Sequence, residues 1–288
     1  NTCSTTQNST AYRLLSVKDA QQQVVQDTSE GYFEKVMPLE MSIQLKQNRS
    51  EEARNKILPD YRRLLQDDVL PFTSSEETAV KAVMDRAFEL CRAIDPNMPL
   101  PTVHLIKTTG NYYGPSVFYT RDNAIVIPAP MVPQSATGNN DGLLATKHHE
   151  IFNINSRNNT KKRDALYARL GFDKLSQLEL SEFLQHRVLY NPDGVDLRYA
   201  ITVKDKEGRA FEAVPVIYSR FKTFNTQKPR FFSHLAFQLF EVKETNGVWK
   251  VVNPNTGYSI NEITGFWEQV ERNTQYNIHP DELCADNF

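Results

Sequence analysis

The chain has 288 residues, of which 40% are hydrophobic and 24% charged, and its formal net charge is −2. This apolar content can bury a sizeable core, so neither metals nor disulfides are needed merely to fold the chain. The charge balance argues against a general nucleic-acid binder, which needs a basic surface to displace counterions from phosphates. No apolar run approaches the ~18 residues that cross a bilayer.

The N-terminal segment, residues 1–8, is polar and has neither an initiator Met nor an apolar signal core. It fits a mature end left after removal of a signal peptide, which would mean export to the periplasm or outside the cell. A trimmed end explains it equally well. Cys3, Cys91 and Cys284 are scattered and odd in number, so they indicate no disulfide framework. Cys91 lies in an apolar run and is expected to be a buried core residue.

Residues 1–100 are expected to form a helical region. One helix is predicted over residues 51–58, with Ser50 as its N-cap and acidic residues in its first turn. A second helix is predicted to open at residues 74–77, because apolar residues at helical spacing follow. Prolines at positions 96, 99 and 101 then interrupt the chain. We therefore place a boundary there, with residues 101–288 as a separate core.

The composition after the prolines favours strands alternating with helices. Strands are predicted at residues 103–106, 116–120, 124–128, 197–203, 214–218, 235–242 and 248–252. Turns are predicted at residues 121–123 and 244–247. Helices are predicted around residues 143–156, around residues 165–170 with Gly171 at the end, and around residues 263–270. This order of elements indicates an α+β fold.

The helix predicted around residues 143–156 contains His149-Glu150. In an HExxH motif, two histidines four residues apart share one helix face and bind one Zn²⁺. The Glu beside the first His can act as general base on a metal-bound water. A His-Glu pair alone is common, so the signal depends on its context.

The C-terminal segment supplies that context. Pro280 suits the first position of a helix, and Asp281 and Glu282 suit its first turn. Glu282 and Asp286 are four residues apart and share a face. One carboxylate can then bind a metal, while the other accepts a hydrogen bond from a ligand imidazole. The two segments together are more specific than either alone.

With these motifs the chain resembles a group of bacterial zinc peptidases of the gluzincin type. The resemblance covers the chain from the proline cluster onward and rests on residues 149–152, 156–159, 166–167, 171–172 and 279–288. It implies a zincin-like core of mixed sheet and active-site helices. It also implies that His149 and Glu282 bind zinc, that Glu150 is the catalytic base, and that Asp286 supports a ligand without touching the metal.

Asn153 departs from the family pattern, because it stands where the second metal-binding histidine is required. A catalytic zinc site ordinarily has three protein ligands and one open position. An amide is a weak, neutral oxygen donor that suits harder cations better than zinc. His148 cannot replace the missing ligand, since adjacent helical residues point about 100° apart. We therefore expect zinc to be weakly bound or absent.

Three interpretations of Asn153 stay open. The chain is a natural pseudoenzyme that keeps the fold for binding, or it carries an inactivating substitution, or Asn153 helps His149 and Glu282 to hold another metal. In a fourth interpretation, these residues lie on ordinary solvated helix faces and have no role in a site.

The function expected from the sequence is a metallopeptidase acting on peptides or proteins, impaired by Asn153. The alternative is an inactive homologue that binds peptides.

Three further residues are candidates for contacts with the substrate or the transition state. Tyr112 and Tyr113 follow Gly110 in a predicted loop, and a phenol there could reach an oxyanion. Loop aromatics more commonly pack on a core. His279 is three residues before Glu282, but it precedes a proline and is expected to cap the start of the helix.

Overall fold

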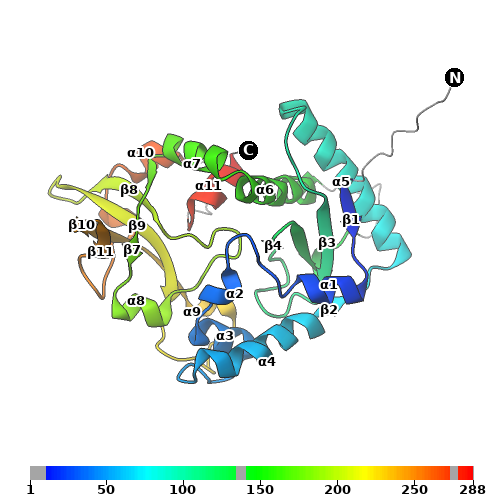
Figure 1. Cartoon of the computed structure of the whole chain (residues 1–288), viewed down its shortest axis with the longest axis horizontal. Helices are drawn as coiled ribbons and strands as arrows, with labels where there is room; N and C mark the ends of the chain where they lie inside the picture. Colours follow the sequence, from blue (N-terminus) through cyan, green and yellow to red (C-terminus); the bar gives the residue numbers. More distant parts are fainter. Residues whose placement is uncertain (1–10, 134–140, 273–277, 288) are drawn as a thin grey trace.

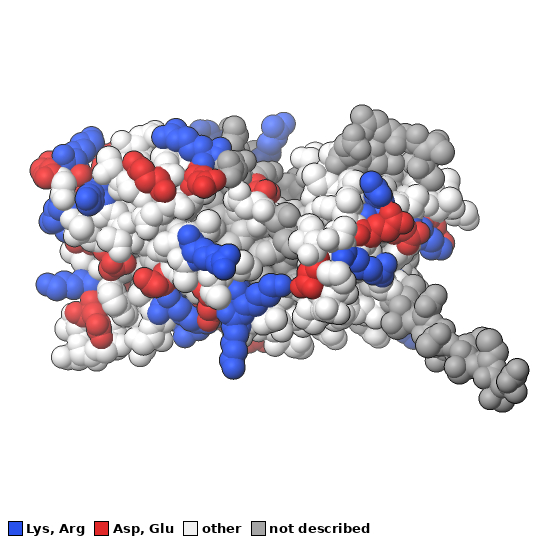
Figure 2. Space-filling view, turned by 90° about the horizontal axis from the view of Figure 1, so that it is seen from above, with Lys and Arg blue, Asp and Glu red and all other residues white. Residues whose placement is uncertain are grey.

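The computed structural model describes residues 11–133, 141–272 and 278–287. Over these residues the chain forms an α+β fold with two β-sheets and helices around them (Figure 1), which confirms the predicted fold class. No helix in the described ranges is long and apolar enough to cross a membrane. Figure 2 shows acidic and basic side chains interspersed over the face seen there.

The first sheet contains β1 (Tyr12–Leu14), β2 (Val69–Leu70), β3 (Val103–Thr108), β4 (Tyr119–Arg121) and β5 (Ala124–Pro128). Its order is β1-β3-β5-β4, and β2 also pairs with β3. The sheet is mixed, because β1 and β5 run parallel to β3 while β4 is antiparallel to β5. β4 is shorter than the strand predicted over residues 116–120, and Asp122-Asn123 makes the predicted turn into β5.

The first hundred residues are mainly helical, but they also contribute to this sheet. Their helices are α1 (Val17–Gln23), α2 (Tyr32–Lys35), α3 (Pro38–Leu45), α4 (Arg54–Asp67) and α5 (Ser74–Ile94). β1 and β2 come from the same region and pair with β3. The predicted boundary near residue 100 therefore stays a prediction, and the first sheet draws strands from both sides of it.

The prediction that Ser50 caps a helix is wrong. α4 begins at Arg54 after Ala53, and the Ser50 hydroxyl donates to Asn48 in the turn before the helix. In that turn Glu52 pairs with Arg49. The helix predicted from residue 74 is confirmed as α5, and its N-cap is Thr73, which forms a capping box with Glu76.

Helices α6 (Asp141–Asn158) and α7 (Thr160–Arg169) follow the first sheet. Ile151 and Ile154 of α6 are fully buried against apolar residues of β3, β5 and α5. Gly171 follows α7 with a φ of 82°, as predicted for a residue after a helix end. A side chain at Gly171 would also collide with Gln269.

The second sheet has six strands in the order β6-β8-β9-β10-β11-β7. These are β6 (Phe172–Lys174), β7 (Leu178–Glu179), β8 (Tyr199–Lys204), β9 (Ala210–Ser219), β10 (Leu235–Thr245) and β11 (Val248–Val251). The predicted hairpin between β10 and β11 is confirmed. Its turn is Asn246-Gly247, and both residues have positive φ, as a tight hairpin turn requires.

The remaining helices are α8 (Glu182–Arg187), α9 (Phe231–His234), α10 (Phe266–Val270) and α11 (Pro280–Asp286). The helical pattern predicted from residue 263 is confirmed only for α10, since Ile263 lies outside a helix. Figure 1 shows α11 beside α6, between the two sheets. Leu283 of α11 belongs to the same buried cluster as Phe152 of α6 and residues of β8. This packing places the two predicted motifs next to each other.

Candidate functional site

His149 of α6 lies between two carboxylates of α11. Its Nε2 is 2.9 Å from Glu282 Oε2, and its Nδ1 is 2.7 Å from Asp286 Oδ1. The other carboxylate oxygen of Glu282 accepts a hydrogen bond of 2.6 Å from the Asn191 side chain. Because Glu282 and Asp286 are four residues apart on one helix, both reach the same imidazole.

This arrangement favours the charged form of His149. Burial opposes the charge, but the hydrogen bonds to Asp286 and Glu282 outweigh it and raise the pKa of His149 to about 12. Burial raises the pKa of Glu282, and the hydrogen bond with His149 outweighs that effect, so the pKa of Glu282 is lowered. In the charged form of His149, both ring nitrogens donate hydrogen bonds, one to each carboxylate.

Two polar residues on α6 beside His149 are buried without hydrogen-bond partners among the described residues. Glu150 is 4% exposed, and its Oε2 makes no hydrogen bond. Asn153 is fully buried, and neither its amide oxygen nor its amide nitrogen is hydrogen-bonded. Such groups are rare in folded proteins, since an unsatisfied buried group costs roughly 1–3 kcal/mol. They suggest that something else, a water molecule or a ligand, satisfies them.

The charge of Glu150 is also disfavoured. Burial is the main cause, and the nearby carboxylate of Asp193 adds to it, so the pKa of Glu150 is raised. His149 and Lys147 oppose this shift, and the pKa of Lys147 is itself lowered by burial to about 7. Its Nζ lies 4.0 Å from the centre of the Phe118 ring and has no hydrogen-bond partner among the described residues.

A cavity of about 460 Å³ opens at these residues. His149, Glu150, Asn191, Asp193, Glu282 and Asp286 line its polar part. The other part is mostly apolar and comes from the segment before β4, from α9 and from the second sheet. It includes Tyr113, Val117, Phe118, Ile217, Phe231 and Leu235. A mainly apolar cavity with a few convergent polar groups is typical of a ligand-binding site.

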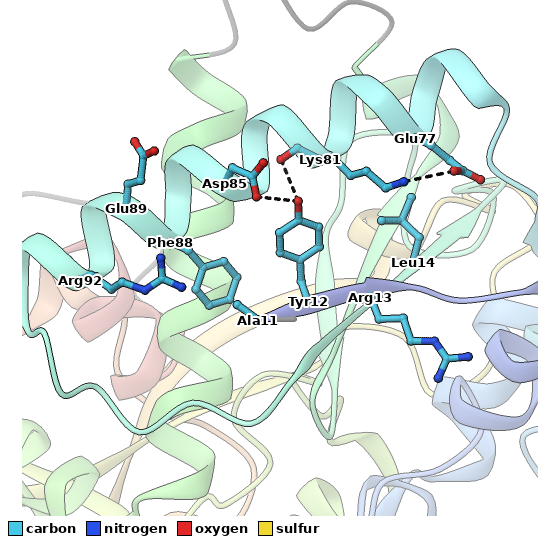
Figure 3. Close-up of a pocket in the computed structure, with 10 residues that line it drawn as sticks. All are labelled: Ala11, Tyr12, Arg13, Leu14, Glu77, Lys81, Asp85, Phe88, Glu89 and Arg92. Atoms are coloured by element: carbon cyan, nitrogen blue, oxygen red, sulfur yellow. Dashed lines mark hydrogen bonds and ion pairs between the residues drawn. The ribbon is translucent and has the colours of Figure 1, made fainter. Parts of the chain in front are cut away.

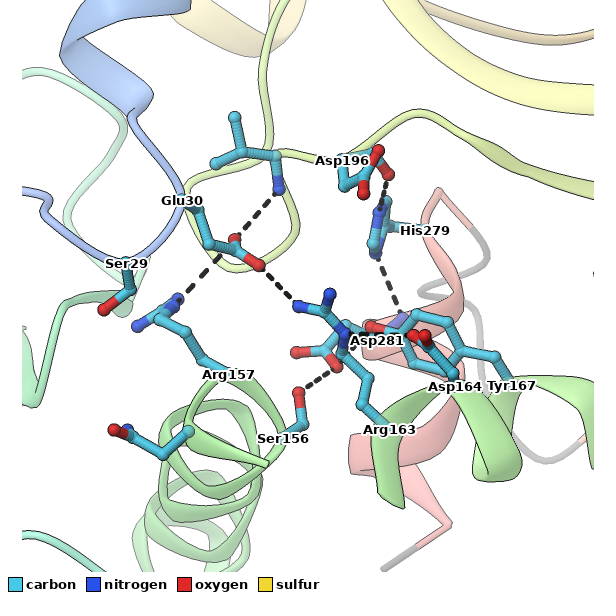
Figure 4. Close-up of polar contacts among 12 residues, drawn as sticks. Ser29, Glu30, Ser156, Arg157, Arg163, Asp164, Tyr167, Asp196, His279 and Asp281 are labelled. Atoms are coloured by element: carbon cyan, nitrogen blue, oxygen red, sulfur yellow. Dashed lines mark hydrogen bonds and ion pairs between the residues drawn. The ribbon is translucent and has the colours of Figure 1, made fainter. Parts of the chain in front are cut away.

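A second layer of polar contacts holds α11 against α6 and α7 (Figure 4). Asp281, next to Glu282, accepts hydrogen bonds from Ser156 at the end of α6 and from Tyr167 of α7, each 2.5 Å long. The Asp281 carboxyl is fully buried, and burial raises its pKa to about 7. These bonds fix the position of Glu282.

Arginines of α6 and α7 extend this layer. Glu30 lies between them, 2.7 Å from Arg163 and 3.9 Å from Arg157, as Figure 4 shows. Arg157 also donates to the Thr120 hydroxyl at 2.7 Å. Thr120 in turn donates its backbone N–H and its hydroxyl to Asp193. Asp193 is thereby held at the cavity by the end of α6 and by β4.

The other residues predicted for the site take structural positions. Tyr113 lines the cavity, but its hydroxyl is 3.1 Å from that of Tyr32 in a buried tyrosine cluster. Tyr112 is not among the residues that line the cavity. His279 caps α11, as expected: its Nδ1 accepts from the backbone of Asp281, and its Nε2 donates to the carbonyl of Asp196.

The remaining histidines do not complete a metal site. His148 lines the cavity but contacts the Ala87 carbonyl through Nε2. His104, His186 and His234 do not line the cavity. The part of the chain that the structure describes has no group of three or more His, Cys, Asp or Glu side chains arranged to hold a metal ion.

Among the described residues, no complete catalytic zinc site is therefore formed. Of the three predicted ligands, His149 and Glu282 are of types that bind zinc well, whereas Asn153 is a weak, neutral donor. A tetrahedral zinc with bonds near 2.1 Å separates its ligand atoms by roughly 3.4 Å. The 2.9 Å between His149 and Glu282 instead fits a direct hydrogen bond.

Asn191 and Asp193 were not predicted as site residues. They lie in the loop between α8 and β8, and the Asn191-Pro192-Asp193-Gly194 segment has the composition of an ordinary turn. Its backbone does form one, since the Gly194 N–H donates to the Asn191 carbonyl. Only long-range packing brings this turn to α11, so no local signal in the sequence indicated a role.

A second groove, of about 870 Å³, lies between β1 and α5 (Figure 3). Tyr12 of β1 spans it and donates to Asp85 of α5. Three basic and three acidic residues line this groove, and none of the predicted site residues does. The cavity at His149 therefore remains the candidate functional site.

Comparison of the chain with protein-family models, with curated proteins and with solved structures found no match.

Proposed function

We propose that this chain is a relative of gluzincin-type zinc peptidases with a zincin-like core, and that its cavity binds peptides with little or no hydrolysis. The observation that carries the proposal is His149, held between Glu282 and Asp286 at the wall of the cavity. A carboxylate behind a ligand histidine is the usual partner of a zinc-binding imidazole. Asn153 lies one turn after His149, where a zinc site of this type requires a second histidine.

The loss of one imidazole predicts weak zinc binding. Metal-free His149 is also stabilised by both carboxylates, so zinc must displace the Nε2 proton before it can bind. In the proposed site Glu150 would be the general base, but without a firmly held metal it has no activated water to deprotonate. The cavity itself is independent of the metal, because its walls come from packed elements of the fold. Peptide binding without efficient cleavage follows.

Peptide cleavage tests this proposal. The unaltered chain and its Asn153→His variant are incubated with zinc and a mixed set of unmodified peptides, and cleavage is followed by mass spectrometry. We expect cleavage only with the variant. The double variant Asn153→His, Glu150→Gln is the matched control and should be inactive while still holding zinc. Efficient, zinc-dependent cleavage by the unaltered chain would overturn the proposal.

A further inference from the structure

The cavity at His149 has two chemically different parts. Four carboxyl groups, those of Glu150, Asp193, Glu282 and Asp286, line one part. Among the described residues that line the cavity there is no Lys or Arg, and the charge of His149 offsets only one of these four groups. A ligand that enters this part therefore meets an excess of acidic groups.

Three of the four carboxyl groups have partners within the protein. Glu282 and Asp286 share His149, and Asp193 accepts two hydrogen bonds from Thr120. Glu150 differs, because its Oε2 is buried, lines the cavity and has no hydrogen-bond partner among the described residues. The Asn153 amide, one turn further along α6, is likewise unpartnered and buried. Glu150 therefore leaves an acceptor oxygen at the cavity, whereas Asn153 does not line the cavity. The buried ammonium of Lys147 acts on Glu150 electrostatically, but it makes no hydrogen bond to it and does not line the cavity.

A primary ammonium group satisfies this arrangement. It carries three N–H donors and one positive charge, so it can serve several acceptors at once and offset the acidic excess. Unlike zinc, it needs no tetrahedral set of three strong ligands. The amino terminus of a peptide presents such a group next to its first side chain.

The apolar part of the cavity selects that first side chain. Phe118, Ile217, Phe231 and Leu235 line it. Phe232 and Met131 also line the cavity and are 55% and 37% exposed, so the apolar surface continues to the outside of the protein. Because burial of a large apolar side chain stabilises binding, a bulky apolar residue is favoured over a small one.

We infer that the cavity binds the free amino terminus of peptides whose first residue is bulky and apolar, with the ammonium at Glu150. The inference rests on the proposed peptide binding and goes further by naming the class of ligand.

Calorimetric titration with three tripeptide amides tests the inference: Phe-Gly-Gly-amide, its N-acetylated form and Gly-Gly-Gly-amide. We expect Phe-Gly-Gly-amide to bind about tenfold or more tightly than its acetylated form, since a charged hydrogen bond is lost. We expect a preference of similar size over Gly-Gly-Gly-amide, since the apolar contact is lost.

Two variants assign these preferences to residues. Glu150→Gln keeps the shape of the side chain and should reduce the preference for the free amino terminus to about twofold or less. Phe232→Ala should reduce only the preference for Phe over Gly. Val252→Ala removes another exposed apolar side chain, outside the cavity lining, and should change neither ratio.

Equal binding of the free and acetylated peptides would overturn the inference and leave the proposed peptide binding standing. An unchanged preference in Glu150→Gln, with the variant shown to be folded by thermal unfolding, would also overturn it. Absence of binding by all three peptides would overturn it as well, whereas the cleavage comparison with Asn153→His tests the relation to zinc peptidases separately.

Discussion

The Nε2 atom of His149 lies 2.9 Å from Glu282, and its Nδ1 atom lies 2.7 Å from Asp286. One imidazolium thus joins two carboxylates that are a helical turn apart on α11. Glu282 is buried and Asp286 partly exposed, their side chains being 7% and 26% exposed. In the proposed site, His149, Glu282 and Asp286 would bind zinc or orient its ligand. They also stabilise the protein without zinc, because a proton on His149 Nε2 takes the place of the metal.

The first prediction concerns stability. His149→Ala leaves Glu282 buried beside no cation, so we expect it to lower the free energy of unfolding by about 3 kcal/mol, as for other broken buried ion pairs. Urea unfolding without added metal measures this. His186→Ala removes an exposed histidine and should cost less than about 0.5 kcal/mol. If both variants are equally stable without metal, the ion pairs do not hold α11 to α6.

The second prediction concerns the contacts behind the site. Tyr167 donates a 2.5 Å hydrogen bond to the fully buried Asp281. Tyr167→Phe should therefore destabilise the protein by about 1–3 kcal/mol, because it leaves a buried carboxyl group short of a donor. Tyr112→Phe, in a half-buried loop position, is the matched control and should be near neutral. Equal effects of the two changes in thermal or urea unfolding would contradict this role of Tyr167.

The third prediction concerns pH. Burial raises the pKa of Glu40 from 4.5 to about 7, although Tyr32 and Tyr190 donate hydrogen bonds to it. The folded state therefore holds this proton more tightly than the unfolded state. The resulting stability is fully present below pH 4.5 and is lost as pH rises through 7, by about 3 kcal/mol in total.

Glu40→Gln removes this titration, so the free energy of unfolding of the variant should fall less between pH 5 and pH 8 than that of the unaltered chain. Urea unfolding at several pH values measures the difference. Glu34→Gln replaces an exposed carboxyl group and should leave the pH dependence unchanged. Parallel pH profiles for the unaltered chain and Glu40→Gln would show that Glu40 is ionised throughout.

The helices that carry the site could be predicted because their signals are local. Pro280 sets the start of α11, and the spacing of Glu282 and Asp286 places both on one face. Likewise, apolar residues at helical spacing define the part of α6 around His149. The turn residues Asn246 and Gly247 specify the β10–β11 hairpin in the same local way.

The rest depends on contacts between distant parts of the chain. β1 has three residues and exists because β3, about ninety positions later, offers it a parallel partner. Asp193 reaches the cavity through Thr120 and Arg157, which lie on separate elements. The cap of α4 was mispredicted because Ser50 and the acidic residues after it are equally suited to the turn they form. No local pattern in the sequence predicts this strand pairing, the position of Asp193 or the start of α4.

In the proposed site, Asn153 stands where a third strong zinc ligand is required. The zinc content of protein purified without chelator, measured by mass spectrometry after dialysis against metal-free buffer, tests it most directly. We predict well under one zinc per chain for the unaltered protein and close to one for Asn153→His, because the variant regains a third strong ligand. One tightly held zinc per unaltered chain would contradict the account.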